Sequence, residues 1–432
     1  MFERRLQLMK AEQIRQIQAR KIKKIINYAY RNVPVIKRKF KDAGISPETI
    51  KTVDDVAKVP FTTKEDFARN YPFGLMAVKP EKVVRIHASS GTTGKPKVVY
   101  YTKKDIETWT RLMARLYDCA GVTNKDIVQN MYGYGLFTGG LGFHYGAERI
   151  GAMVVPAATG NTKRQIMLMK DFGTTVIACT PSYALYLCEA VKAEGLDPKK
   201  DLRLRIGLFG AEPWSEEARK KIQETFGLLA IDCYGMSELY GPGVACECPE
   251  QNGLHVWGDE FYIETINPET GEVLEEGKEG ELVITMLNRE AMPILRYRTR
   301  DLGRVIWEEC ECGRAHPRIM RIKGRSDDML IIGGVNVFPS QIEHVLLQIP
   351  ELAEFYQIVV THDKLDRLNV QVELKPEVAQ DKNYNLEKLK SNIESDLLSV
   401  LSIHANVELM QPGTLPRTEG KAKRVLDLRK KE

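Results

Sequence analysis

The stretch from Ser89 to Lys97 combines hydroxyls, glycines and lysines in a pattern that suits an anionic ligand. It reads Ser-Ser-Gly-Thr-Thr-Gly-Lys-Pro-Lys. The glycines let the backbone curl, so that hydroxyls and backbone N–H groups can point at one anion. Apolar runs at 83–86 and 98–101 flank the stretch. We therefore predict a loop between two β-strands that holds a polyphosphate.

The spacing of this segment argues against a Walker-type P-loop, which has four residues between its glycines and Lys-Ser/Thr opening a helix. Only Thr92 and Thr93 separate Gly91 from Gly94, and a proline follows Lys95. The remaining alternative is a solvated surface turn. A run of nine residues of these types in this order makes that alternative less favoured.

Further segments place carboxylates or basic groups at the ends of predicted strands and near the C-terminus. They are 210–213, 232–238, 297–303, 323–328 and 415–421. Taken singly, these are equally typical of a strand-end turn, a surface salt bridge, a polar linker or a solvated lysine. Ligands do bind at the carboxyl ends of parallel strands in open α/β sheets.

In their order along the chain, these segments resemble the motifs of adenylate-forming enzymes, the superfamily of acyl-CoA synthetases, luciferases and peptide-synthetase adenylation domains. The resemblance implies that Tyr234 stacks on adenine, Glu238 is directed at Mg²⁺ and Asp301 accepts hydrogen bonds from the ribose. The nucleotide-binding residues that it implies are Ser89, Ser90, Gly91, Thr92, Thr93, Gly94, Lys95, Lys97, Ala211, Glu212, Asp232, Tyr234, Gly235, Met236, Ser237, Asp301, Ile322 and Arg325. The catalytic residues that it implies are Lys421, Lys97, Thr93 and Glu238.

The resemblance also implies a moving C-terminal domain. Asp327 corresponds to the hinge about which that domain turns, and Gly333, Gly334 and Val335 correspond to the turn that lines the CoA channel. The cofactors and substrates implied are ATP or AMP, Mg²⁺ and coenzyme A.

Within the superfamily, the chain most resembles the phenylacetate–CoA ligase family, on the segments 132–140, 236–243 and 327–340. This implies ATP-dependent ligation of an aryl acid, such as phenylacetate, to CoA. The aryl slot implied is formed by Tyr132, Phe137, Gly139, Ala211 and Pro242. Aromatic rings at 132, 134 and 137 can wall such a slot, but they can equally pack in the core.

Two other functions stay open at this point. A ligase for benzoate or indoleacetate, or an adenylation enzyme that loads a carrier protein, shares these motifs. A degenerate ATP sensor is disfavoured because Lys421 and Glu238 are both present.

The eight cysteines suggest a metal site rather than disulfides, since the chain has no export signal. Cys246 and Cys248 form one Cys-x-Cys pair, and Cys310 and Cys312 form another. With His255 in place of one cysteine as a possible fourth ligand, four of these five residues suit a structural zinc ion. The alternative is free thiols.

The bulk composition is that of a soluble globular protein, with 43% hydrophobic and 28% charged residues. No apolar run is long enough to cross a bilayer, and the N-terminus lacks a signal peptide, so we expect a cytoplasmic enzyme with no membrane partner. The net charge is +5, and the basic residues at 1–41 fit the outer face of an amphipathic helix. We expect no nucleic-acid partner. A homodimer is plausible by resemblance.

A chain of 432 residues exceeds one ordinary core. We predict an α/β fold with a large N-terminal adenylation domain at 1–326, which has mostly parallel sheets and a β-rich subdomain, and a small, mobile α+β lid at 327–432. Strands are expected at 127–131, 152–155, 176–179, 206–209, 229–233, 260–266, 281–286, 302–308, 358–361, 369–374 and 405–409. Helices are expected within 1–60 and at 104–119, 162–172, 181–193, 215–226, 340–348 and 385–401.

Overall fold

The computed structural model of this chain describes residues 1–89, 96–322, 324–326, 330–332, 335–362, 366–381, 383–416 and 424–429. Its α-helices are α1 (Arg4–Gln7), α2 (Ala11–Asn32), α3 (Pro34–Asp42), α4 (Lys64–Arg69), α5 (Lys103–Cys119), α6 (Gly139–Ile150), α7 (Thr162–Asp171), α8 (Pro181–Ala193), α9 (Pro198–Asp201), α10 (Glu216–Phe226), α11 (Pro339–Leu347), α12 (Pro376–Gln380) and α13 (Leu386–Leu401). Short 3₁₀ turns are η1 (Pro47–Thr49), η2 (Asp54–Lys58), η3 (Pro80–Lys82) and η4 (Ser237–Leu239).

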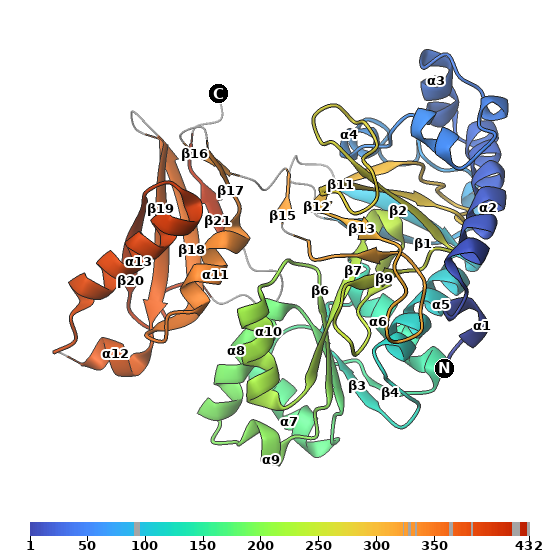
Figure 1. The fold of residues 1–432 in the computed structure, drawn as a ribbon. Helices are drawn as coiled ribbons and strands as arrows, with labels where there is room; N and C mark the ends of the chain where they lie inside the picture. Colours follow the sequence, from blue (N-terminus) through green and yellow to red (C-terminus); the bar gives the residue numbers. More distant parts are fainter. Residues whose placement is uncertain are drawn as a thin grey trace.

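The strands follow the same numbering in Figure 1. They are β1 (Val83–Ser89), β2 (Lys97–Thr102), β3 (Ile127–Asn130), β4 (Met153–Val155), β5 (Val176–Cys179), β6 (Ile206–Gly210), β7 (Leu229–Met236), β8 (Gly241–Cys246), β9 (Leu254–Val256), β10 (Phe261–Ile266), β11 (Gly280–Met286), β12 (Tyr297–Gly303), β13 (Val305–Ile306), β14 (Arg318–Ile319), β15 (Gly324–Arg325), β16 (Leu330–Ile332), β17 (Val335–Val337), β18 (Leu352–His362), β19 (Asp366–Leu374), β20 (Ala405–Met410) and β21 (Val425–Asp427).

A nine-stranded sheet forms the centre of the N-terminal part, in the order β13-β14-β9-β8-β7-β6-β5-β3-β4. Its strands from β4 to β7 run parallel, and those from β7 to β13 run antiparallel. The parallel strands are mostly apolar because helices cover both faces. Along β5, Val176 and Ala178 join the core with α5 and α6, whereas Ile177 and Cys179 join the core with α7, α8 and α10.

A second, antiparallel sheet has the order β10-β11-β12-β15. Helix α2 packs beside it through a stripe of isoleucines, and Gln18 Nε2 donates a hydrogen bond to the carbonyl oxygen of Phe261 at the start of β10. The amphipathic helix expected in the basic N-terminal region is therefore present. The expected α/β class with a β-rich subdomain is confirmed.

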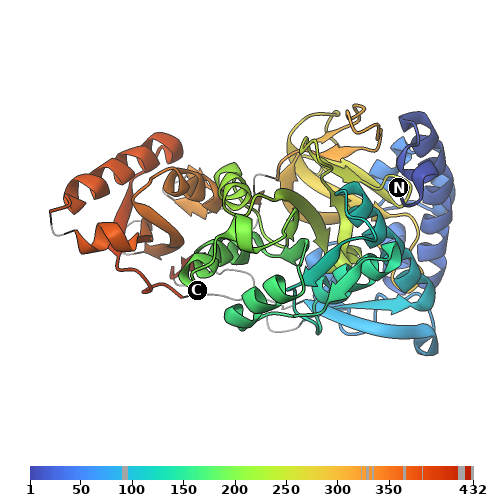
Figure 2. The ribbon, with the colours of Figure 1, turned by 90° about the horizontal axis from the view of Figure 1, so that it is seen from below.

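The C-terminal part has its own core, built on a sheet in the order β20-β19-β18-β21 with α11 and α13 against it. Figures 1 and 2 show it beside α8 and α10. His344 Nδ1 in α11 lies 3.0 Å from a carboxylate oxygen of Glu217 in α10, and Lys221 in α10 forms an ion pair with Glu354 in β18. The predicted domain boundary at Asp327 lies outside the described residues, between β15 and β16.

The prediction differs from the structure in one predicted strand and in one helix that was not predicted. The strand predicted at 302–308 is wrong because the chain crosses between sheets at Arg304: β12 belongs to the second sheet and β13 to the first. Helix α6 was not predicted, since its first turn contains three glycines, which are weak helix formers. Those glycines permit close packing: a Cβ on Gly142 would lie 2.7 Å from the Trp109 ring, and one on Gly146 would lie 2.5 Å from Met113.

Within the part of the chain that the structure describes, no helix has the length and apolarity needed to cross a membrane.

Candidate functional site

The hairpin that frames the predicted phosphate loop is present. Strands β1 and β2 pair antiparallel, with Ser89 opposite Lys97. The loop itself lies outside the described residues, and so do the roles predicted for Ser90, Gly91, Thr92, Thr93, Gly94 and Lys95. The same holds for Asp327, Gly333, Gly334 and Lys421.

The other predicted nucleotide residues lie on or beside strand ends at one edge of the central sheet, where the second sheet contributes β12 and β15. Ala211 and Glu212 follow β6; Asp232, Tyr234, Gly235 and Met236 lie in β7; Ser237 and Glu238 in η4; Asp301 in β12; and Arg325 in β15, with Ile322 just before it. Strands β6 and β7 are parallel neighbours, and β12 and β15 pair Asp301 with Arg325. Val335, predicted for CoA, begins β17.

Lys97 and Glu238 form a buried ion pair in which the Lys97 ammonium donates to Glu238 Oε1. The hydroxyl of Tyr297 donates to the same oxygen at 2.9 Å. Burial raises the pKa of Glu238, but the Lys97 charge and the hydrogen bonds from Lys97 and Tyr297 together outweigh burial, so the net pKa lies below the usual value. Glu238 is therefore an ionised carboxylate, and Lys97 from the hairpin is in direct contact with it.

Tyr234 and Asp301 form the second polar contact at this edge. The Tyr234 hydroxyl donates to Asp301 Oδ2 at 2.5 Å, and Arg325 Nη1 lies 3.8 Å from the other Asp301 oxygen. Burial and the Asp301 charge raise the pKa of Tyr234, so its phenol stays a proton donor. The residues predicted for adenine and for ribose are thus neighbours.

The adenine-side segment after β6 has a strained backbone. Ala211 adopts a left-handed conformation with φ 74°, which a non-glycine residue seldom takes. Glu212 Oε1 accepts a hydrogen bond from the Ser182 N–H at 2.7 Å, at the start of α8. Burial and the neighbouring Glu247 raise the pKa of Asp232 to about 7.

The residues predicted for the aryl acid lie next to this edge. Tyr132 is buried, its ring stacks on Phe143 at 4.9 Å, and its hydroxyl donates to the Cys179 carbonyl at 2.6 Å. A Cβ on Gly139 would lie 3.3 Å from the Tyr132 ring. One face of Tyr132 therefore packs in the core, as the alternative interpretation held, and Gly139 lies close against the ring.

The rest of the predicted aryl group lies on neighbouring elements, from the sheet edge to the exposed end of the loop. Its hydroxyl lies 3.3 Å from the Gly210 carbonyl, one residue before Ala211. Pro242 pairs with Gly235 across β7 and β8. Phe137 is 56% exposed at the tip of the loop. The structure thus brings Tyr132, Gly139, Ala211 and Pro242 to the edge that carries the nucleotide residues, with Phe137 at the tip of the same loop.

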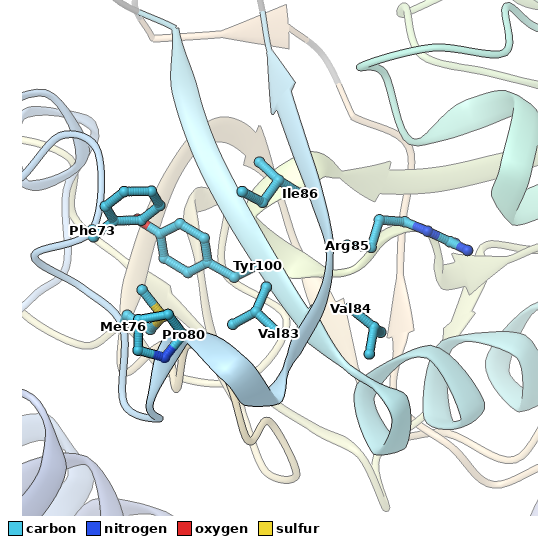
Figure 3. A pocket seen from close by; sticks show the side chains of 8 residues that line it. All are labelled: Phe73, Met76, Pro80, Val83, Val84, Arg85, Ile86 and Tyr100. Carbon is cyan, nitrogen blue, oxygen red and sulfur yellow. The ribbon is translucent and has the colours of Figure 1, made fainter.

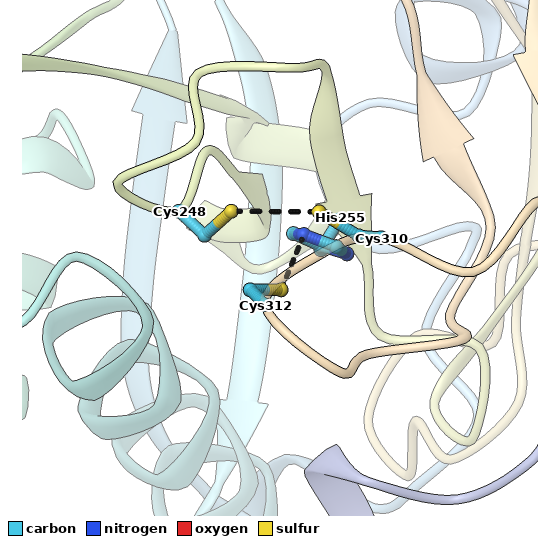
Figure 4. A group of neighbouring side chains, drawn as sticks. All are labelled: Cys248, His255, Cys310 and Cys312. Atoms are coloured by element: carbon cyan, nitrogen blue, oxygen red, sulfur yellow. Dashed lines mark hydrogen bonds between the residues drawn. The ribbon is translucent and has the colours of Figure 1, made fainter.

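Four of the five candidate zinc ligands converge in the antiparallel half of the molecule (Figure 4). The ligand atoms of Cys248, His255, Cys310 and Cys312 all lie within 4.8 Å of one another. Cys248 Sγ is 3.8 Å from Cys310 Sγ, and Cys312 Sγ is 3.4 Å from His255 Nε2. A tetrahedral zinc with bonds of about 2.3 Å to sulfur and about 2.0 Å to nitrogen spaces its ligands about 3.5–3.8 Å apart.

Cys246 does not join this group. Its thiol, still within β8, points at the helix α5 and lies 3.6 Å from the Leu116 carbonyl oxygen. In the cluster, the hydrogen bond from Cys248 and the nearby His255 lower the pKa of Cys312, and burial lowers the pKa of His255. The donor set of three thiols and one neutral imidazole fits zinc.

Three contributors to the site were missed from the sequence: Tyr297, Asn130 and His87. Tyr297 lies inside the motif at 297–303. It is four residues before Asp301 on the same strand, so the period of two along a strand could have placed both side chains on one face. Asn130 and His87 contact the predicted acid-binding loop through side-chain hydrogen bonds, which no sequence spacing indicates.

A separate apolar groove lies on the outer side of the β1–β2 hairpin (Figure 3). It is lined by Phe73, Met76, Pro80, Val83, Val84, Arg85, Ile86 and Tyr100. These lining residues include none of the residues predicted for the site.

Two family models match the chain: "AMP-binding enzyme" over residues 11–287 and "AMP-binding enzyme C-terminal domain" over 334–429. A phenylacetate-coenzyme A ligase from Pseudomonas putida is 48% identical, covering 96% of this chain and 94% of its own length. The chain belongs to the phenylacetate-coenzyme A ligase family. Another member of this ligase family, from Thermus thermophilus, is 45% identical over the full length of both chains.

This chain is similar in structure to a 2-hydroxyisobutyryl-CoA ligase, which has been solved in more than one state. In its postadenylation state with 2-HIB-AMP, that enzyme matches with a TM-score of 0.93 and 28% identity, covering 98% of this chain and 91% of its own. In its thioesterification state with 2-HIB-AMP and CoA, the TM-score is 0.73 at 29% identity, covering 99% and 92%. Since the coverage is nearly the same, the arrangement of the two parts of this chain is more similar to that of this neighbour in its postadenylation state.

Proposed function

We propose that the chain ligates an aryl carboxylic acid, phenylacetate, to coenzyme A through an acyl-adenylate. The observation that carries the proposal is the convergence of two residue groups at one sheet edge, in a chain of this family. The first group, proposed to bind the nucleotide, is Tyr234, Asp301 and the Lys97–Glu238 pair. The second group, proposed to bind the acid, includes Tyr132 and Pro242, which lie next to β6 and β7.

In the first step, a carboxylate oxygen of the acid attacks the α-phosphorus of ATP. The bond from this phosphorus to the bridging oxygen breaks, and diphosphate leaves with the bonding electrons. Charge develops on the phosphate oxygens, which fixed donors and cations stabilise. We assign this role to the hairpin loop, Lys97 and Lys421.

In the second step, the CoA thiol loses its proton and its sulfur attacks the acyl carbon, so that AMP leaves. We infer that the C-terminal part turns about Asp327 between the steps and presents the segment at 333–335 to CoA. The different TM-scores against two states of one neighbour support such a movement. A rearrangement between steps keeps the reactive anhydride away from water.

We propose Glu238 as the protein ligand of Mg²⁺. Its carboxylate is ionised and buried, and Mg²⁺ is bound through few carboxylates and shared with substrate phosphates. An ion held there would neutralise phosphate charge, and Lys97 beside Glu238 would supply a second positive charge to the phosphates.

We propose that Cys248, His255, Cys310 and Cys312 hold a structural zinc ion. Four protein ligands leave no open position for catalysis. Protein purified without chelator should contain about one zinc per chain, and a content below about 0.2 would contradict the assignment.

The reaction is tested by a panel of phenylacetate, benzoate and indoleacetate with Mg·ATP. We expect diphosphate release with phenylacetate as the preferred acid, and an aryl thioester when CoA is added. If diphosphate is released but the acyl group is transferred only to a carrier protein, the acceptor in the proposal would be the carrier protein and not CoA. No diphosphate with any acid would overturn it.

The assignment of Lys421 is tested by Lys421→Ala. This change should lower adenylation about 10²–10³-fold and leave thioester formation from supplied acyl-adenylate unchanged. Equal losses in both half-reactions would contradict the proposed domain movement.

A further inference from the structure

The segment at 132–140, here called the acid loop, connects β3 to α6 and carries the residues assigned to the aryl acid. It contains no strand, and its helix begins only at Gly139. Its tip is open to solvent, with Leu136 62% and Phe137 56% exposed. A loop without its own ladder of backbone hydrogen bonds keeps one shape only if other groups hold it.

Asn130, the last residue of β3, holds the base of the acid loop. Its side chain is fully buried, with 0% exposed. Its Oδ1 accepts from the Tyr132 N–H at 3.2 Å, while its Nδ2 donates to the Gly140 carbonyl at 2.7 Å and to the Tyr134 hydroxyl at 2.8 Å. One amide therefore joins the beginning and the end of the loop.

The base of the loop is also closed by direct backbone contact. A Cβ on Gly140 would lie 2.5 Å from the Gly133 carbonyl oxygen, so the two ends of the loop touch. The Tyr134 hydroxyl continues the network to His144 Nδ1 in α6 at 3.1 Å. The amide of Asn130 thus sits where the loop leaves the strand and enters the helix.

His87 holds the tip of the acid loop from β1. The side chain is 1% exposed, and its Nδ1 lies 3.0 Å from the Leu136 carbonyl oxygen. The Ala88 N–H donates to the same oxygen at 2.9 Å. Because a carbonyl only accepts, Nδ1 carries the proton. Burial lowers the pKa of His87, so the ring is neutral.

The surroundings of His87 keep its ring in this position. The ring packs edge-on against Tyr101 and Trp109, with centroids 5.4 and 5.8 Å away. Two residues further along β1, Ser89 enters the predicted phosphate loop. The tip of the acid loop is therefore attached to the strand that leads to the nucleotide.

We propose that Asn130 and His87 are positioning residues that hold the acid loop at its base and its tip, and thereby set the affinity for the carboxylic acid. This inference rests on the proposed function. The inference assigns to these two buried side chains a role in binding the acid. Their side-chain hydrogen bonds described above go to the acid loop, and none goes to a predicted nucleotide residue.

Asn130→Asp tests the base of the loop, because it keeps the shape of the side chain and removes both donors. We expect KM for phenylacetate to rise about 10-fold or more while KM for ATP changes less than about 2-fold. Gln129→Glu is the matched control. Gln129 precedes Asn130 in β3, is equally buried, and bonds to Gln165 in α7 instead of to the loop.

His87 gives an independent test at the tip. His87→Phe keeps an aromatic ring and removes the donor, so KM for phenylacetate should rise about 10-fold. His87→Asn places an amide N–H close to the position of Nδ1 and should restore KM to within about 3-fold of the wild type. Should Asn130→Asp fail to fold, Tyr134→Phe removes one bond of the same network and should raise this KM about 3-fold.

Given a wild type that releases diphosphate with phenylacetate, two results would overturn the inference. One is an equal change of KM for the acid in Asn130→Asp and Gln129→Glu. The other is the same KM for the acid in His87→Phe and His87→Asn. A merely structural role would lower the melting temperature of these variants and leave KM for the acid unchanged. A wild type that is inactive with every aryl acid would instead overturn the proposed function, and the inference with it.

Discussion

The cysteine cluster and the nucleotide edge differ in how their polar atoms are satisfied. In the cluster, three thiols and an imidazole converge on one another, and His255 Nδ1 is buried with no hydrogen-bond partner among the described residues. At the nucleotide edge, Lys97 pairs with Glu238 and Tyr234 donates to Asp301. Among the described residues, Lys97, Glu238 and Asp301 there each have a partner from the chain itself.

This difference fits two kinds of ligand. A preformed set of convergent donors suits an ion that stays bound and stabilises the fold. Groups that satisfy one another suit a substrate that comes and goes, since unpaired buried charges are costly between turnovers. Changes in the cluster should therefore cost stability, and changes at the nucleotide edge should cost turnover.

The largest effect is expected for Glu238→Gln. The amide can still accept from Lys97 and Tyr297, so the fold should survive, but the charge proposed to bind Mg²⁺ is lost. Adenylation should fall about 10²–10³-fold. We would measure ATP–diphosphate exchange together with the melting temperature. A large fall in melting temperature with little loss of ATP–diphosphate exchange would contradict the comparison, because Glu238 would then serve stability and not turnover.

The complementary change is Cys312→Ser, which removes one donor of the cluster. The melting temperature should fall by about 5–10 °C and bound zinc should be lost, while the folded fraction keeps its adenylation rate. Cys246→Ser is the control because its thiol lies outside the cluster, and it should retain zinc. If both variants keep zinc and stability, the cluster is not a metal site.

Glu343 in α11 adds a pH dependence where the C-terminal part meets the nucleotide side. Burial, aided by Glu212 and opposed by Arg424, raises its pKa to about 7. The folded protein therefore binds more protons than the unfolded chain between about pH 4.5 and 7, and this group's contribution to stability falls as pH rises through that range. We expect a loss of about 1–3 kcal/mol in the free energy of unfolding. Glu343→Gln should flatten that part of the pH profile, and an unchanged profile would refute the assignment.

The smallest effect is expected for Tyr234→Phe. It removes the hydroxyl that donates to Asp301 and leaves the aromatic face intact. The free energy of unfolding should fall by about 0.5–1.5 kcal/mol, and KM for ATP should change less than about 3-fold. A loss of exchange as large as that of Glu238→Gln would mean that the hydroxyl, and not the ring, is what the nucleotide needs.

The sequence predicted the elements whose pattern is periodic. The apolar strand β5, the isoleucine stripe of α2 and the helices α5, α8 and α10 all followed from apolar runs and spacing. Helix α6 was not predicted because glycines are weak helix formers, whereas Gly142 and Gly146 allow it to pack closely against α5. The strand at 302–308 failed because apolar spacing does not reveal that a chain changes sheets.

The same division holds for the site. Motif residues such as Tyr234, Asp301 and Glu238 could be named because their order along the chain resembles a family. The choice among five zinc ligands could not be made, since it depends on where β8 ends between Cys246 and Cys248. Asn130 and His87 act through hydrogen bonds to backbone carbonyls, so their importance depends on the shape of a loop and not on residue spacing.

The most direct test of the account is a product analysis with Mg·ATP, phenylacetate and CoA. We predict that purified wild-type protein forms AMP, diphosphate and phenylacetyl-CoA in equal amounts, and that leaving out phenylacetate stops all three. ADP in place of AMP, or phenylacetyl-CoA without diphosphate, would contradict the proposed chemistry.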